Sequence, residues 1–206
     1  MRVLVTGAGG FIGSHLVEAL VRDGHEVWGM ARYASRDTYG WLDEVDGCAK
    51  IRGDVTDINQ MRRIIKGVER VYHLAAFGSV PYSFDAPQQV LNANIMGTMS
   101  VALACAEYGV GMVHTSTSEV YGGSPADQDE NTPVSALSPY AASKIGADQI
   151  VKALCASQGL SAVILRPFNT YGPRQSARAV IPRIILACNE PETRTVKVLI
   201  EEEKPS

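Results

Sequence analysis

Residues 1–13 read MRVLVTGAGGFIG, a short apolar run that stops at a cluster of glycines. The run at residues 3–5 is aliphatic and β-branched, as in a strand that is buried on both faces of a parallel sheet. Gly7, Gly10 and Gly13 are spaced three apart, and the apolar side chains that follow, to residue 21, recur at helical spacing. The order of strand, glycine turn and helix predicts a turn that holds a pyrophosphate at a helix N-terminus.

Length and composition limit the possible classes of protein. The 206 residues give room for one well-buried domain and are few for two, and a net charge of −3 provides no basic field for a nucleic-acid backbone. We therefore expect no nucleic-acid partner. The cysteines Cys48, Cys105, Cys155 and Cys188 are scattered, without a CxxC pair or a zinc-like histidine spacing. We expect reduced thiols and no metal site.

The location is predicted from the first residues and from the hydropathy. The chain enters a strand at once, without a charged leader and apolar run of signal-peptide length, and no segment reaches the ~18 apolar residues of a membrane span. We expect a cytoplasmic protein that has no membrane partner.

Strand-like and helix-like segments alternate along the chain. Further strands are expected at residues 26–31, 50–54, 71–76 and 111–117, and a long, mostly buried helix is expected at residues 87–108. This alternation predicts an α/β fold with a doubly wound parallel sheet, the Rossmann type. Ligands bind beyond the carboxyl ends of such strands, which is where we expect Thr6, Ala75, Thr117 and Asn169.

The end of the second strand bears on the choice of cofactor. An acidic residue there would accept the ribose hydroxyls of NAD, whereas an arginine would accommodate the additional phosphate of NADP. This chain has Ala31 and Arg32 at the position, and Arg32 could equally be a solvated loop residue. Both cofactors therefore remain open. Asp54, after the third strand, is expected to face the adenine, and Asp57 to cap the next helix.

Tyr140 and Lys144 carry the predicted chemistry. They lie four residues apart in a strongly helical segment, so that they share one face. A phenol with a pKa of about 10 is a poor base, but a nearby ammonium and the positive charge of an oxidised nicotinamide favour the phenolate. Thr117, at the end of a neighbouring strand, could hydrogen-bond the same substrate oxygen. These residues predict removal of a hydroxyl proton together with hydride transfer.

Several motifs together resemble one known family. TGAGGFIG at residues 6–13, the Tyr140 and Lys144 pair, Thr117 before VYG, and RPFNTYGP at residues 166–173 are similar to the extended short-chain dehydrogenase/reductases that act on nucleotide sugars. The resemblance covers residues 1–186, and its nearest form is the NAD-dependent epimerase/dehydratase group. Within that group, residues 115–122, 138–148 and 172–182 most resemble the UDP-N-acetylglucosamine 4,6-dehydratases of nonulosonic-acid pathways.

The resemblance implies a reaction on the sugar ring. Tyr140 would take the proton of the 4-hydroxyl while hydride leaves C4, Glu119 would remove the C5 proton, and water would leave from C6. A 4-epimerase begins with the same oxidation and is the first alternative. Ser118 stands where glucose-type dehydratases have an acid. A UDP-glucuronate decarboxylase, which has a related Thr-Ser-Glu arrangement, is therefore another alternative.

The resemblance also assigns the binding residues. The cofactor, NAD or possibly NADP, would be held by residues from the glycine turn and the following strand ends, namely Gly7, Gly10, Phe11, Ile12, Gly13, Arg32, Asp54, Val55, Leu74, Ala75, Ala76, Tyr140 and Lys144. The nucleotide-sugar substrate would be bound by Ser79, Tyr82, Ser118, Asn169, Arg174 and Arg178.

Relatives of this family continue into a C-terminal substrate domain. Here residues 1–186 are expected to form the cofactor-binding domain with the Tyr140 and Lys144 pair. Residues 187–206 are expected to be a divergent tail or a remnant of a substrate domain, with one strand at residues 196–200. With the substrate domain largely missing, a cofactor-binding module without turnover is the non-enzyme alternative. Helices at residues 87–108 and 138–157 would form a homodimer by a four-helix contact, as they do in relatives.

Overall fold

The computed structural model describes residues 1–33, 37–123 and 127–189, which form two compact units divided after Asn169. The first unit, Met1–Asn169, contains the sheet, and the second begins at Thr170 and includes helix α7 (Val180–Asn189). The strand expected at residues 196–200 and the tail from residue 190 lie outside the described residues. The domain boundary expected after residue 186 stays a prediction.

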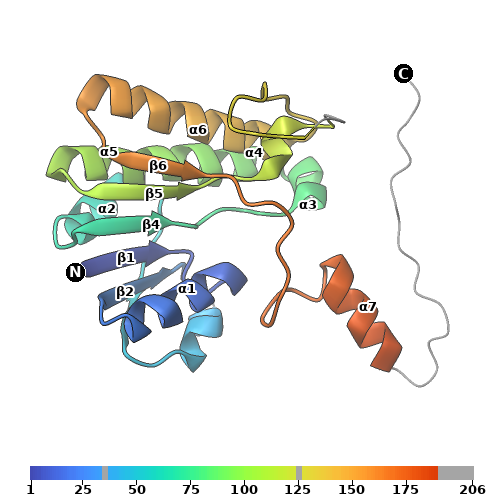
Figure 1. Cartoon of the computed structure of the whole chain (residues 1–206). Helices are drawn as coiled ribbons and strands as arrows, with labels where there is room; N and C mark the ends of the chain where they lie inside the picture. The colour runs from blue at the N-terminus through green and yellow to red at the C-terminus, as the bar shows by residue number, and fades with distance from the viewer. Residues whose placement is uncertain (34–36, 124–126, 190–206) are drawn as a thin grey trace. The chain divides into compact units, whose positions relative to one another are not determined.

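The first unit is built on a six-stranded sheet in which every neighbouring pair is parallel (Figure 1). Its strand order, β3-β2-β1-β4-β5-β6, is that of the Rossmann fold. The strands are β1 (Arg2–Thr6), β2 (Glu26–Ala31), β3 (Cys48–Arg52), β4 (Arg70–His73), β5 (Gly111–Thr115) and β6 (Ala162–Leu165). The predicted α/β doubly wound sheet is confirmed.

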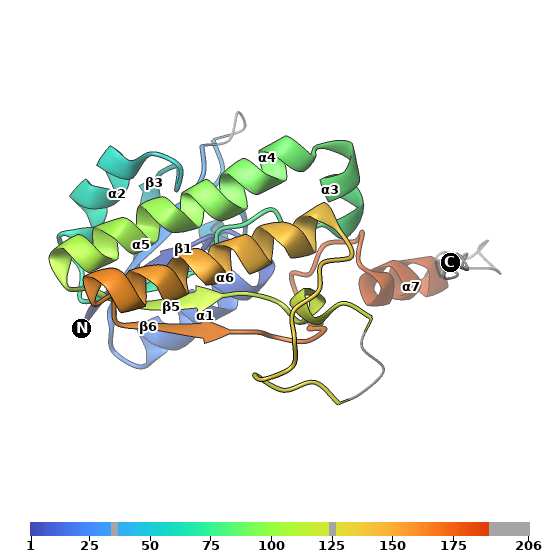
Figure 2. The ribbon, with the colours of Figure 1, turned by 90° about the horizontal axis from the view of Figure 1, so that it is seen from above.

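Helices cover the two faces of this sheet with two separate apolar cores (Figure 2). Helix α1 (Phe11–Arg22) and the short 3₁₀ helix η1 (Gly40–Glu44) bury Val17 and Leu42 against one face. Helices α2 (Ile58–Ile65), α5 (Gly97–Tyr108) and α6 (Pro139–Gln158) bury Met61, Val101 and Val151 against the other. Asp57 caps α2 as predicted, because its carboxylate accepts the Gln60 backbone N–H.

Strands β4 and β5 end earlier than the sequence predicts. Gly7 has a φ of +70°, which ends β1 at Thr6, and the ladder between β1 and β4 therefore stops at the pair of Thr6 and His73. The residues expected to extend β4 to residue 76 and β5 to residue 117 instead form loops at the carboxyl edge. This shortening places Ala75 in a loop that lines a cavity, and Thr117 at the start of a short 3₁₀ helix, where its side chain is buried.

The helix expected at residues 87–108 is interrupted in its middle. It consists of α4 (Pro87–Leu91), a π turn η2 (Asn92–Met96) and α5, and an unpredicted short helix, α3 (Val80–Asp85), precedes it. The buried side chain of Asn94, in the π turn, accepts the Phe77 backbone N–H and donates to the Phe77 carbonyl and to the Ser143 hydroxyl. Among the described residues, Pro87–Tyr108 is the one stretch long and apolar enough to cross a membrane, but half of it is buried, as in a core helix.

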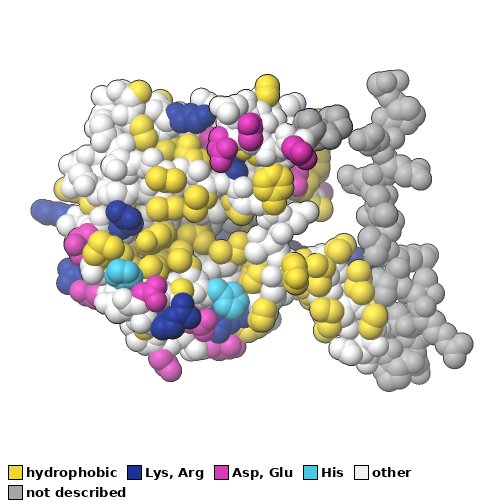
Figure 3. All heavy atoms as spheres, viewed as in Figure 1, with side chains coloured by type: hydrophobic (Ala, Val, Ile, Leu, Met, Phe, Trp, Pro, Cys, Tyr) yellow, Lys and Arg dark blue, Asp and Glu magenta, His cyan; other side chains and the backbone are white. Residues whose placement is uncertain are grey.

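One face of edge strand β6 is not covered by a helix of the first unit. Ala162 and Ile164 pack toward α6, whereas Val163 and Leu165, on the opposite face, are 57% and 51% exposed. Hydrophobic side chains gather on this side of the first unit in Figure 3. Because strands of parallel sheets are normally buried on both faces, helical cover on the α1 side is incomplete at β6.

Candidate active site

The glycine turn forms a cradle at the start of α1. The Gly10 N–H donates to the Gly7 carbonyl at 3.1 Å, and Gly10 caps α1 without any side-chain cap. The first N–H groups of the helix are therefore free to bind an anion. A Cβ on Gly13 would overlap the Gly7 carbonyl oxygen, and one on Gly7 would lie 2.8 Å from the Ala75 nitrogen. Both positions thus require glycine, and the turn beside the free N–H groups of the helix suits a pyrophosphate.

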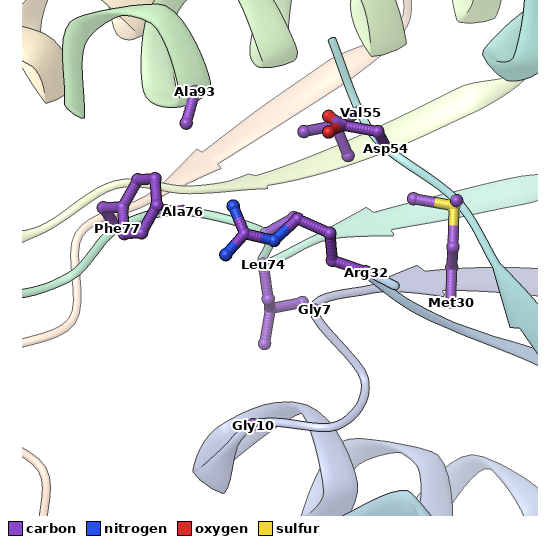
Figure 4. Close-up of a pocket in the computed structure, with 12 residues that line it drawn as sticks. Gly7, Gly10, Met30, Arg32, Asp54, Val55, Leu74, Ala76, Phe77 and Ala93 are labelled. Atoms are coloured by element: carbon purple, nitrogen blue, oxygen red, sulfur yellow. The ribbon is translucent and has the colours of Figure 1, made fainter. Parts of the chain in front are cut away.

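A cavity of about 310 Å³ opens beside this cradle at the carboxyl edge of the sheet (Figure 4). Its lining includes eight of the predicted cofactor residues: Gly7, Gly10, Arg32, Asp54, Val55, Leu74, Ala75 and Ala76. Phe11, Ile12 and Gly13 lie in the first turn of α1. Met30, Gly53, Phe77 and Ala93 also line the cavity and were not predicted. For Phe77 the only sequence signal was its place directly after the small residues that follow β4.

A buried hydrogen-bond chain fixes the backbone beside this cavity. The Thr6 hydroxyl accepts the N–H groups of Leu74 and Ala75, each at 3.2 Å, and meets His73 Nδ1 at 2.8 Å. With both acceptor positions of its oxygen used, this hydroxyl donates to Nδ1, and His73 Nε2–H donates to the Thr98 hydroxyl at 3.0 Å. Burial lowers the pKa of His73 well below 6.5, so the ring is neutral.

Thr117 and Tyr140 meet at the end of β5. Thr117 caps the short 3₁₀ helix η3 (Ser118–Tyr121), and Tyr140 is the second residue of α6. Burial raises the pKa of Tyr140, and the charge of Glu119 raises it further, although a hydrogen bond with Thr117 acts in the opposite direction. Glu119 is exposed. The structure thus brings three of the four predicted catalytic residues together.

Lys144 is buried one turn along α6 from Tyr140. Its side chain is 3% exposed, and Nζ donates to the Thr115 carbonyl at 2.6 Å. Burial lowers the pKa of Lys144 to about 8, while the charge of Asp148 raises it. We expected the Lys144 ammonium to lower the pKa of Tyr140. In the protein without cofactor, burial instead raises the pKa of Tyr140, and the Lys144 ammonium is bonded to the end of β5.

Asp148 and Arg166 form a buried ion pair that sequence reasoning missed. Asp148 Oδ2 accepts from the Ser116 hydroxyl at 3.0 Å and from Arg166 Nε and Nη2 at 3.2 and 3.1 Å. Arg166 Nη1 also donates to the Tyr121 hydroxyl at 3.1 Å. His114 Nε2 lies 3.4 Å from Asp148 Oδ1. The available signal was the i, i+4 spacing of Lys144 and Asp148 on one helix face.

The predicted substrate residues of the first unit lie around its carboxyl edge. Ser79 caps α3 by accepting the Tyr82 N–H at 3.3 Å, and the Tyr82 hydroxyl donates to Gln89. Ser118 donates its backbone N–H to the Pro167 carbonyl at 3.0 Å, and Asn169 is exposed. All four roles in substrate binding stay predictions.

Arg174 and Arg178 belong to the second unit. Arg174 has a φ of +69°, and the Arg178 N–H donates to the Ser176 hydroxyl at 3.3 Å. The structure describes these arginines within their own unit, and their contact with a substrate stays a prediction.

A pyridine-nucleotide dehydrogenase needs a site for the dinucleotide and a side chain that can transfer a proton. This chain has the glycine cradle and, on α6, the pair of Tyr140 and Lys144. A Tyr-x-x-x-Lys pair of this kind is typical of the short-chain dehydrogenase/reductases. More narrowly, the chain belongs to the NAD dependent epimerase/dehydratase family, whose model matches residues 3–202. The family is NAD-dependent, and the cradle and cavity described above fit a nicotinamide dinucleotide.

Known proteins support this assignment. The chain is 37% identical over 193 residues to a dTDP-glucose 4,6-dehydratase of Mycobacterium tuberculosis, covering 90% of this chain and 58% of the relative. The solved structure of DesIV, a dTDP-glucose 4,6-dehydratase from Streptomyces venezuelae with NAD bound, matches with a TM-score of 0.83 at 33% identity, covering 91% and 62% of the two chains.

A UDP-N-acetylglucosamine 4-epimerase from Methanobrevibacter ruminantium, in complex with UDP-N-acetylmuramic acid, also matches with a TM-score of 0.83, at 34% identity. That match covers 91% of this chain and 62% of the epimerase. The chain thus spans about three-fifths of the length of these relatives.

Proposed function

We propose that the protein is a nucleotide-sugar 4,6-dehydratase that acts on a UDP-sugar such as UDP-N-acetylglucosamine. The observation that carries the proposal is the meeting of Thr117, Glu119 and Tyr140 at the end of β5, with buried Lys144 behind them. The similarity to dTDP-glucose 4,6-dehydratases supports a dehydratase. The choice of UDP-N-acetylglucosamine rests on the motif resemblance at residues 115–122 and 138–148.

In this proposal NAD, when bound, supplies a hydride acceptor for C4 of the sugar and a hydride donor for C6. Tyr140 accepts the proton of the 4-hydroxyl, and Thr117 orients that hydroxyl. Because burial raises the pKa of Tyr140, the phenol is protonated in the cofactor-free protein at neutral pH. The positive charges of the oxidised nicotinamide and of Lys144 are needed to favour the phenolate during turnover.

Glu119 performs the second half of the reaction. Oxidation at C4 acidifies the hydrogen on C5, because the resulting carbanion is an enolate. The Glu119 carboxylate takes that proton, the 6-hydroxyl takes up one proton and leaves as water, and the hydride is returned to C6 while a proton is returned to C5. The two protons consumed equal the two that Tyr140 and Glu119 accepted. Glu119 is exposed and therefore open to a substrate.

Two other enzyme reactions share the same first step. A 4-epimerase would return hydride to the opposite face of C4, and the similarity to a UDP-N-acetylglucosamine 4-epimerase supports it as the second candidate. Ser118, in place of an acid, favours a UDP-glucuronate decarboxylase as the third. Because the chain spans about three-fifths of its relatives, a cofactor-binding module without turnover is the non-enzyme alternative.

The test is incubation of the purified chain with NAD and UDP-N-acetylglucosamine, followed by mass spectrometry and NMR of the sugar. Loss of one water with a 4-keto signal is the expected result. Tyr140→Phe should abolish it, whereas Tyr108→Phe, on an exposed tyrosine of α5, should not. Glu119→Gln should stop exchange of the C5 hydrogen with deuterated water. An inverted C4 with unchanged mass would refute the dehydratase in favour of the epimerase.

We further propose a cytoplasmic homodimer without nucleic-acid or membrane partners. The helices expected at the dimer contact correspond to α4, η2, α5 and α6, and Leu91 in α4 and Met96 in η2 are 37% and 44% exposed. Sedimentation equilibrium of the chain tests this assembly. A single species of monomer mass at all concentrations would refute it.

A further inference from the structure

The adenosine end of the cavity has a cation where an acid would bind the ribose of NAD. Strand β2 ends at Ala31, and Arg32 follows it and lines the cavity. We propose that this end of the cavity binds a phosphate on the 2′-oxygen of the adenosine, so that the protein binds NADP at least as tightly as NAD. The inference rests on the cofactor site of the proposed function and not on its sugar chemistry.

The Arg32 side chain is available for such a phosphate. Figure 4 shows it extending across the cavity, between Phe77 on one side and Asp54 and Val55 on the other. Its guanidinium lies over the Phe77 ring at 5.2 Å from the centroid. Within the described part of the chain, the Arg32 guanidinium forms no ion pair with a carboxylate. An unpaired guanidinium in a cavity presents the forked donors that suit a phosphate.

The neighbouring arginine, Arg52, is bonded to other residues of the protein. Its Nη1 donates to the carbonyls of Arg32 and Thr38 at 3.2 and 2.8 Å, and its Nη2 lies 3.1 Å from the Asp37 carboxylate. Its guanidinium also stacks on the Tyr39 ring at 3.6 Å. Arg52 therefore fixes the backbone of Arg32, and of these two arginines Arg32 is the one that lines the cavity.

Asp54 is the acidic side chain that shares the cavity lining with Arg32. Its carboxylate Oδ1 accepts the backbone N–H and the hydroxyl of Thr56, at 2.9 and 2.8 Å. These bonds hold its negative charge toward the start of α2. No carboxylate stands at the end of β2 itself, where the sequence is Met-Ala-Arg, so that nothing there would repel a 2′-phosphate.

The test is isothermal titration of the full chain with NADP and with NAD, in the absence of any sugar. Two fragments, adenosine 2′,5′-bisphosphate and 5′-AMP, differ only in the 2′-phosphate and isolate its contribution. We expect NADP to bind at least as tightly as NAD, and the bisphosphate more tightly than AMP. Arg32→Met keeps most of the length without the charge and should weaken NADP by about 10- to 100-fold, with a much smaller effect on NAD.

Arg32→Asp should reverse the preference in favour of NAD, and Arg63→Met, on an exposed arginine of α2, should change neither affinity. Equal losses of NADP and NAD in Arg32→Met would mean that Arg32 only stacks on the adenine, and would overturn the proposal. Tighter binding of NAD than of NADP by the unaltered chain would overturn it while leaving the proposed function intact. Binding of neither dinucleotide would refute both.

Discussion

Replacing Asp148 with asparagine removes the charge that holds helix α6 to Arg166, the residue directly after edge strand β6. The side chain is 1% exposed and faces Arg166, whose side chain is 12% exposed. Asparagine keeps the shape and one acceptor oxygen but leaves the guanidinium uncompensated. Breaking a buried pair in this way costs about 3–5 kcal/mol. Because Arg166 retains the Tyr121 hydroxyl and some contact with water, we expect the free energy of unfolding to fall by about 3 kcal/mol.

Urea unfolding at pH 7 measures this loss, from the shift of the midpoint at unchanged slope. The matched control is Asp57→Asn, because asparagine at that exposed position remains a good helix cap and should cost less than about 0.5 kcal/mol. Adding Arg166→Met to the Asp148 variant removes the orphaned charge. The double-mutant cycle should then show coupling between the two positions.

The pH dependence of the loss tests the charge itself. Burial would raise the pKa of Asp148, but His114, Ser116 and Arg166 together hold it below its ordinary value of 3.8. A carboxylate with a lowered pKa stabilises the fold fully above its unfolded pKa and loses that contribution as the pH falls through the folded pKa. The difference between the parent chain and the variant should therefore close below about pH 3.8. A loss equal to that of the control at pH 7 would refute the reasoning.

Three further variants test other parts of the site. Gly13→Ala should abolish titratable NAD binding, because its Cβ overlaps the Gly7 carbonyl, whereas Gly78→Ala, whose Cβ meets nothing within 4 Å, should not. In the parent chain the free energy of unfolding should rise by about 3 kcal/mol between pH 8 and 10.5, because the pKa of Lys144 is about 8 in the folded state and 10.5 in the unfolded state. Lys144→Met should remove this rise, and parallel pH curves of the two proteins would contradict the prediction. Asn94→Ala should cost about 3 kcal/mol in urea unfolding and exposed Asn92→Ala about 0.5 or less.

Features that depend on local rules could be predicted from the sequence. Glycine spacing gave the cradle, and the four-residue spacing of Tyr140 and Lys144 placed both on α6. The alternation of strands and helices gave the sheet, and the motif resemblance gave the family that the family model confirms. The individual roles of the site residues stay predictions.

Features that depend on distant partners could not be predicted in the same way. The end of β4 is set by its ladder to β1, which Gly7 terminates, and not by the apolar run of β4 itself. The π turn in the long helix accompanies the bonds from Asn94 to Phe77 and Ser143, 17 and 49 residues away. Asp148 could be placed on the face of Lys144, but its partner Arg166 is brought to it by strand β6.

One group of buried polar side chains in the first unit lies at the carboxyl edge of the sheet. Thr6, His73, Ser116 and Thr117 lie at or just beyond strand ends, while the strand centres bury aliphatic side chains. Buried polar groups cost stability unless each has a partner, and burial lowers the pKa of Lys144 to about 8, so that keeping its ammonium charged costs stability. This edge therefore gives up stability that apolar residues could have provided. A loss of stability of this kind is expected where buried polar side chains are required for chemistry rather than for folding. The same edge of the sheet is therefore the place to test catalysis and cofactor choice.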